Sequence, residues 1–154
     1  MVRPPGGREI FWKVPFKEIK NNRLKELFPV FVMGIREQIE PCGFLGLRGT
    51  QEIIRRCKSH ELLPHIRGII YPLKDNLQTL DDDICINTIN VILSLAKKSD
   101  TVAEAFVPLF NILLPSVDVL RNKHEVGARK PKNRRPMSAV PAEKKFVKLV
   151  DLKR

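Results

Sequence analysis

The segment Asp81–Lys98, DDDICINTINVILSLAKK, is the clearest helical pattern in the sequence. Its opening aspartates suit a helix N-terminus, where carboxylates bind free backbone N–H groups and meet the positive end of the dipole. Its closing lysines suit the opposite end. Side chains suited to a core recur at three- and four-residue intervals: Ile84, Cys85, Thr88, Ile89, Ile92, Leu93, Leu95 and Ala96. So wide a stripe predicts a helix packed on more than one side, with Ile89 and Ile92 at the centre of the core.

Helical patterns also precede this segment. We expect a helix over Leu27–Gln38 with Pro29 in its first turn, where a missing N–H costs nothing. A break with a short apolar turn follows at Pro41–Gly49, because glycine and proline there are typical of a loop. Thr50 is then expected to cap a short helix that runs through Cys57.

Prolines punctuate the remaining helical segments. Glu61–Thr79 is expected to be helical, with Pro64 in the first turn and Pro72 kinking or splitting the helix. Beyond the central helix we expect these features in order: a segment capped by Asp100 through Phe106, and further turns begun or kinked by Pro108 and Pro115 before Leu120.

The leading prolines also mark an internal repeat. Pro29, Pro64 and Pro108 each follow two apolar residues and lie 35 and 44 residues apart. Helical solenoids of the HEAT and armadillo type repeat at about 40–47 residues, and three units are near the minimum for a stable stack. No segment alternates with the period of a strand. The sequence therefore predicts an all-α, armadillo/HEAT-like α-solenoid of irregular helix pairs, with at least five helices and no sheet over residues 20–122.

The two ends of the chain differ from the middle in charge. The net charge is +5 over residues 1–25, −3 over residues 26–120 and +9 over residues 121–154. We therefore divide the chain into an N-terminal arm (1–19), a helical domain (20–122) and a basic C-terminal extension (123–154). Basic ends favour a polyanionic partner, which charge alone leaves open as nucleic acid, an anionic membrane or an acidic protein.

Aromatic residues mark the end of the N-terminal arm. Trp12, the only tryptophan, stands among Phe11, Val14 and Phe16. Pro15 argues against an ordinary helix here, so an extended segment packed on the domain is expected. Trp12 either anchors this segment at the core or its edge, as large aromatics usually do, or serves as a docking contact.

Two further observations bear on the compartment. No run of about 18 apolar residues exists, and the first residues lack an apolar signal region, so neither a membrane span nor a secretory signal is expected. Cys42, Cys57 and Cys85 are odd in number and scattered, which indicates a reducing, intracellular environment.

Motifs for catalysis or metal binding are weak. Cys57, His60 and His65 form C-x2-H-x4-H, but no second pair follows to complete the four ligands that zinc needs. Asp81 to Asp83 are better explained by a helix N-terminus, and His124 has no evident nucleophile nearby. The GxxGxxG spacing at residues 43–49 lacks the strand and the GK[ST] of a phosphate loop. We expect no enzyme activity, no metal and no cofactor.

Several segments resemble the parkin co-regulated protein family in order and spacing. The resemblance covers about residues 11–123 and is most specific in LLPHIRGIIYPLKDNLQTLDDDICINTINVILSL and FVPLFNILLPSVDVL. It implies an armadillo/HEAT-like α-solenoid without catalytic residues. It also implies an axonemal protein at the inner junction of doublet microtubules, where the B-tubule closes onto the A-tubule, in contact with α/β-tubulin and a small β-rich junction protein. Residues 127–154 depart from the family pattern, which continues with another amphipathic helix.

Three classes of function follow. The resemblance favours a structural microtubule-binding protein of the ciliary or flagellar axoneme, located in the cytoplasm and cytoskeleton. The alternatives are a cytosolic helical-repeat adaptor that binds a protein or peptide, and a nucleic-acid binder, which the lack of an aromatic platform in the basic runs disfavours. No membrane partner is expected. The candidate contact residues for tubulin or another partner are Arg3, Arg8, Trp12, Arg129, Lys130, Lys132, Arg134 and Arg135.

Overall fold

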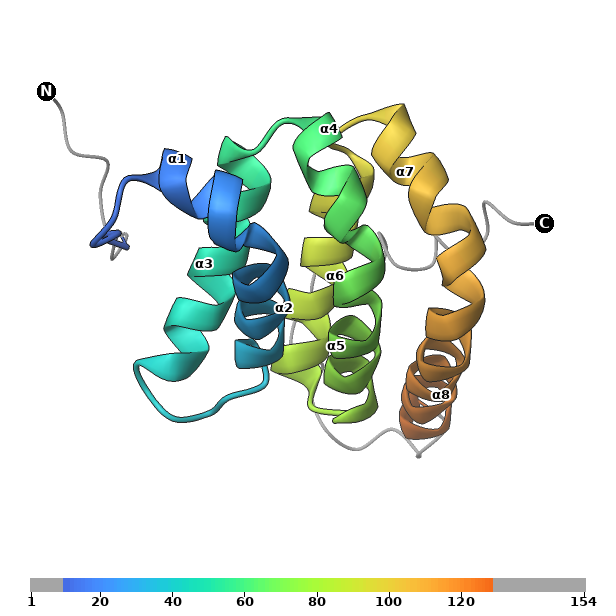
Figure 1. The fold of residues 1–154 in the computed structure, drawn as a ribbon. Helices are drawn as coiled ribbons and strands as arrows, with labels where there is room; N and C mark the ends of the chain where they lie inside the picture. Colours follow the sequence, from blue (N-terminus) through green and yellow to red (C-terminus); the bar gives the residue numbers. More distant parts are fainter. Residues whose placement is uncertain (1–9, 129–154) are drawn as a thin grey trace, which may run out of the picture. The chain divides into compact units, whose positions relative to one another are not determined.

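The computed structural model describes residues 10–128, and every regular element in that range is helical (Figure 1). The chain divides into two compact units, Met1–Arg121 and Asn122–Arg154, and the packing below concerns the first. The prediction of an all-α fold with at least five helices and no sheet within residues 20–122 is confirmed. The α-helices are α1 (Phe16–Glu18), α2 (Leu24–Gly34), α3 (Cys42–Arg56), α4 (Ser59–Leu62), α5 (Ile66–Gln78), α6 (Asp82–Ala96), α7 (Asp100–Phe106) and α8 (Phe110–Ala128).

Helices α2, α3, α5 and α6 form the centre of the first unit. Helix α2 packs against α3 and α5, and α6 packs against α3, α5 and α7. In Figure 1, α2 and α5 lie side by side. Helix α3, which follows α2 in the sequence, lies beside α2, and α6 lies beside α5. Residues from all these helices line one core, whose largest fully buried side chains include Phe28, Ile53, Leu62, Ile66, Ile69, Leu73, Leu95 and Phe106.

The central helix α6 forms where the sequence predicts it. The Asp81 carboxylate accepts hydrogen bonds from the backbone N–H groups of Asp83 and Ile84, each at 3.1 Å. Ile92 is buried as expected, but Ile89 is only partly buried and packs against the edge of the core. The prediction for Ile89 is wrong because α3, α5 and α7 surround α6 incompletely, which leaves one side of the helix toward solvent.

Helix α3 replaces the break predicted at Pro41–Gly49. It begins at Cys42, runs without interruption to Arg56, and buries Thr50 in its interior rather than using it as a cap. The glycines that indicate a loop in the sequence instead allow α2 and α3 to approach closely. A Cβ atom on Gly46 would overlap the backbone of Gly34. Tertiary packing therefore overrides the local turn signal.

Prolines sit deeper in the helices than the sequence predicts. Helix α2 begins at Leu24, so Pro29 lies inside it and not in its first turn, and Pro72 lies within an unbroken α5. Pro64 and Pro108 occupy short 3₁₀ turns, at residues 63–65 and 107–109, which lead into the helices that follow. These tighter turns accommodate a proline because fewer backbone donors are required at a helix start.

The start of α7 differs from the sequence prediction by one residue. Ser99, and not Asp100, is the N-cap: its hydroxyl oxygen accepts a hydrogen bond from the backbone N–H of Val102 at 3.3 Å. Asp100 is the first helical residue, where its charge still meets the positive end of the helix dipole. Farther along, Pro115 lies inside α8, which continues through it.

The N-terminal aromatic segment is partly helical. Pro15 is the N-cap of α1, which continues into a π-helical turn over Ile19–Arg23, so the prediction of an extended segment is wrong from Phe16 onward. The Trp12 ring packs edge-on against Phe16 and Phe31, with centroids 5.6 and 5.5 Å apart. Trp12 therefore ties the arm to α2, as expected of an anchor at the edge of the core.

The last helical stretch, Asp100–Glu125, is long and apolar enough by length and composition to cross a membrane, and 22% of its most apolar window is buried. The expectation of no membrane span rested on uninterrupted apolar runs, which the charged and polar residues of this stretch break. A single such helix does not establish a span, because core helices pass the same test. Here Val102, Phe106 and Leu113 are part of the core.

Candidate polyanion-binding surface

Only one residue of the predicted contact set lies in the described range of residues 10–128. That residue, Trp12, is half-buried between two phenylalanines, which leaves part of its ring exposed. The basic residues of the set lie outside the described range: Arg3, Arg8, Arg129, Lys130, Lys132, Arg134 and Arg135. The basic side chains that the structure does place on the domain are different ones.

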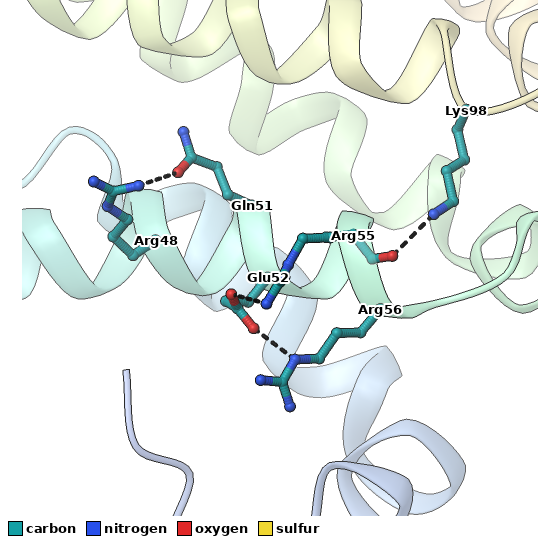
Figure 2. Close-up of polar contacts among 6 residues, drawn as sticks. All are labelled: Arg48, Gln51, Glu52, Arg55, Arg56 and Lys98. Atoms are coloured by element: carbon teal, nitrogen blue, oxygen red, sulfur yellow. Dashed lines mark hydrogen bonds and ion pairs between the residues drawn. The ribbon is translucent and has the colours of Figure 1, made fainter. Parts of the chain in front are cut away.

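The outer side of α3 carries cations in line. Glycine, threonine and isoleucine residues form the buried side of α3. Arg48 and Arg55, seven residues apart, are exposed on the other side of the helix. Seven residues correspond to about two turns, or about 10 Å along the axis. Lys97 and Lys98 stand at the end of the neighbouring helix α6. We call Arg48, Gln51, Arg55, Lys97 and Lys98 the α3–α6 basic surface; Figure 2 shows all of these residues except Lys97.

The arginines of α3 are held by short polar contacts. Arg48 Nη1 donates to Gln51 Oε1 at 3.3 Å. Glu52, the only acid on α3, binds Arg55 through one carboxylate oxygen and Arg56 through the other, each at 2.6 Å (Figure 2). Arg56 also lies over the Phe16 ring, 5.2 Å from its centroid. One carboxylate shared between two guanidinium groups leaves the surface with excess positive charge.

Lys98 connects the ends of α3 and α6. Its Nζ donates to the backbone carbonyl oxygen of Arg55 at 3.1 Å, across 43 residues of sequence. The last carbonyls of a helix lack intrahelical partners and carry the negative end of the dipole, so a lysine stabilises this position. The contact holds the cations of the two helices at one place on the domain.

The exposed side of α6 adds polar but uncharged groups. No charged residue occurs in its sequence between Asp83 and Lys97. Asn90 and Ser94 are exposed there, and the Ser94 hydroxyl donates to the Asn90 carbonyl at 2.7 Å. This part of α6 therefore has no carboxylate that would repel an anionic ligand.

A buried thiol lies beneath the surface. Burial, followed by the charge of the Glu61 carboxylate, raises the pKa of Cys57 to about 11, although Lys20 and Lys98 act in the opposite direction. The thiol is consequently protonated at neutral pH and is a poor nucleophile or metal ligand. His60 is exposed, and burial followed by the charge of Lys25 lowers the pKa of His65. Among the described residues, no three His, Cys, Asp or Glu side chains are grouped as metal ligands.

The α3–α6 basic surface is not evident in the net charge of the sequence, because charge summed over a long segment hides it. Residues 26–120 have a net charge of −3, but the acids Asp81, Asp82 and Asp83 stand at the start of α6, whereas the lysines stand at its end. The seven-residue spacing of Arg48 and Arg55 is a signal that was present. This spacing places the two arginines on one side of a helix only if α3 is continuous from Cys42 to Arg56.

Comparisons with known proteins agree on one family. The family model described as "Parkin co-regulated protein" matches residues 3–140. A mouse protein named "Parkin coregulated gene protein homolog" is 29% identical over 116 residues, which are 75% of this chain and 46% of the mouse protein. The chain thus spans about half the length of this curated relative.

Proposed function

Because this chain belongs to the parkin co-regulated protein family, we propose that it is a structural microtubule-associated protein of the ciliary or flagellar axoneme. Its proposed position is at or near the inner junction of doublet microtubules, where it binds α/β-tubulin and inner-junction proteins and links the A- and B-tubules. The proposed location in the cell is the cytoplasm and cytoskeleton of the cilium. In this role the protein is a spacer and not an enzyme.

The observation that supports tubulin binding is the α3–α6 basic surface. Tubulin is acidic, and a row of exposed cations that includes Arg48, Arg55 and Lys97 complements it. The terminal cations, among them Arg3, Arg8 and Arg129, add attraction of the same sign. Long-range attraction of this kind raises the association rate with a large polyanion.

A spacer also needs a rigid body, and the helix pairs supply one. Helices α2 and α3, and likewise α5 and α6, run antiparallel in Figure 1. The two pairs share one core, and α7 packs on the second pair. We propose that they are the first units of an armadillo/HEAT-like stack, in which each pair contacts its neighbours. Such a stack transmits load between two attachment surfaces without an internal hinge.

Microtubule co-sedimentation and the localisation of a tagged copy test this function. We expect the protein to pellet with microtubules and to mark the axoneme of a ciliated cell. The triple variant R48A/R55A/K97A should pellet less at low ionic strength, where attraction between exposed charges is least screened. A diffuse cytosolic signal together with no microtubule binding would contradict the proposal.

A second candidate function, a helical-repeat adaptor for a protein partner, is favoured by a different surface. Val30 and Met33 on α2 and Tyr71 on α5 are 59%, 41% and 61% exposed on two helices that pack together. Exposed aromatic and methionine side chains are enriched at protein interfaces. The double variant V30S/Y71S should weaken capture of a protein partner and leave microtubule pelleting unchanged if the adaptor function is correct.

A further inference from the structure

We infer that the α3–α6 basic surface binds an extended, carboxylate-rich peptide segment lying along α3. This inference deepens the proposed function, since it names the chemical part of an acidic partner that the surface recognises. It rests on the spacing of the cations, on their free donors and on the chemistry of the groups between them.

The cations already bind a carboxylate within the chain. The Glu52 side chain lies between Arg55 and Arg56 with two contacts of 2.6 Å, the geometry of a charge-assisted pair. The Arg55 side chain nevertheless remains 69% exposed, whereas that of Glu52 is 22% exposed. A guanidinium has five N–H donors, so the pair with Glu52 and the high exposure of Arg55 leave donors accessible to a ligand.

The spacing of the cations suits an extended chain. Arg48 and Arg55 are about 10 Å apart along the helix axis, and side chains on one side of an extended peptide repeat about every 7 Å. Long flexible arginine side chains bridge this difference of a few ångströms. Lys98, fixed on the Arg55 carbonyl, and its neighbour Lys97 continue the cationic row beyond the end of α3.

The groups beside the cations favour a peptide over nucleic acid. Gln51, Asn90 and Ser94 are exposed amides and a hydroxyl, which pair with the N–H and C=O groups of a peptide backbone. Single-stranded nucleic acid is normally held by aromatic side chains on which successive bases stack. Helix α3 has one aromatic residue, the half-buried Phe44, and α6 has none.

Fluorescence anisotropy with a labelled deca-glutamate peptide tests the inference on the full chain. We expect saturable binding that weakens with added salt and falls by about tenfold or more in R48A/R55A, because two charge-assisted contacts are lost. The variant E52Q should bind more tightly than the parent, because the internal carboxylate no longer competes for Arg55. Circular dichroism confirms that each variant keeps its helix content.

The matched control is K25A/R67A, which removes the same charge from exposed positions on α2 and α5. It should retain parental affinity. Unchanged binding in R48A/R55A, or an equal loss in the control, would overturn the inference. So would tighter binding of a single-stranded oligonucleotide of equal charge through Arg48 and Arg55.

Parallel pelleting with microtubules separates the inference from the proposed function. Microtubule binding without peptide binding contradicts the peptide-binding surface and leaves the proposed function standing. Peptide binding that depends on Arg48 and Arg55, without microtubule binding, supports the surface and contradicts the proposed partner.

Discussion

One buried amide, that of Asn76, joins two helices 44 residues apart in sequence. Its Nδ2 donates to the backbone carbonyl oxygen of Val32 at 2.7 Å, near the end of α2. The same carbonyl accepts a longer hydrogen bond, 3.3 Å, from the backbone N–H of Ile35 at the end of α2, and the Asn76 side chain is fully buried. Asn76 therefore adds a second, shorter hydrogen bond to the last turn of α2 from a helix distant in the sequence.

We expect Asn76→Ala to destabilise the fold by about 0.5–1.5 kcal/mol, because the Val32 carbonyl loses the shorter of its two hydrogen bonds. The midpoint of urea denaturation measures this loss. Asn90→Ala, an exposed change on α6, is the control and should shift the midpoint little. Equal midpoints for the two variants would show that Asn76 does not stabilise α2.

The burial of two isoleucines on α6 predicts two different costs of truncation. Ile92 is 5% exposed, so Ile92→Ala should cost about 2–5 kcal/mol through lost contacts and a residual cavity. Ile89 is only partly buried, so Ile89→Ala should cost less. Denaturant titration of both variants checks the order, and the reverse order would mean that the inward side of α6 is misassigned.

At the scale of elements, glycine acts in opposite ways on α3 and α5. Gly46 touches the backbone of Gly34, so a methyl group there forces α2 and α3 apart. Gly68 is exposed, and its nearest neighbour to an added Cβ is Pro29 Cγ at 3.7 Å, an ordinary contact. Replacing glycine by alanine is therefore expected to lower stability at Gly46 and to raise it at Gly68.

We expect Gly46→Ala to lower the melting temperature and Gly68→Ala to raise it slightly. Alanine in a helix is favoured over glycine by about 0.5–1 kcal/mol, which appears at Gly68 but is outweighed by the clash at Gly46. Thermal melts followed by circular dichroism measure both. A Gly46→Ala melting temperature at or above that of the parent would contradict the close packing of α2 and α3.

Glu61, in the first turn of α4, makes the stability of the fold depend on pH. The Lys20 ammonium, followed by the backbone N–H of Lys58, holds the pKa of Glu61 below its ordinary value. The Lys58 N–H donates to Glu61 Oε2 at 2.7 Å, and Lys20 pairs with Oε1. A carboxyl with a lowered folded-state pKa contributes stability above its unfolded pKa and loses it as the pH falls through the folded value.

We therefore expect the free energy of unfolding of the parent to decrease as the pH is lowered from neutral to below the ordinary pKa of a glutamate. Glu61→Gln should be less stable than the parent at pH 7 and should show a smaller loss on acidification. Urea midpoints measured as a function of pH test this. The same slope in both proteins would remove Glu61 from the acid response.

At the scale of the whole molecule, the sequence supplies a second group of cations near its C-terminus, outside the described residues. We expect neutralising five of them to weaken microtubule co-sedimentation, with the larger loss at low salt because screening already weakens the contact at high salt. A neutral variant that pellets like the parent at low salt would restrict the contact to the helical domain. The five residues are Arg129, Lys130, Lys132, Arg134 and Arg135.

Features that arise from local periodicity and capping are predictable from the sequence. The extent of α6 and its Asp81 cap followed from apolar spacing and terminal charge, and the absence of strands in the described range from the lack of alternation. Helix periodicity and helix dipoles act within a few residues, so a linear pattern records them. The resemblance that identified the family likewise lay in contiguous segments.

Features that depend on neighbours distant in the sequence become visible only in the folded chain. The glycines of α3 indicated a loop until the close approach of α2 made them the contact surface of a helix. Lys98 reached the end of α3 across 43 residues, which gathered the basic surface that summed charge had hidden. Local propensity amounts to about 1 kcal/mol per residue, and the packing of a whole helix side exceeds it. The fold class was thus readable from the sequence, and the candidate binding surface was not.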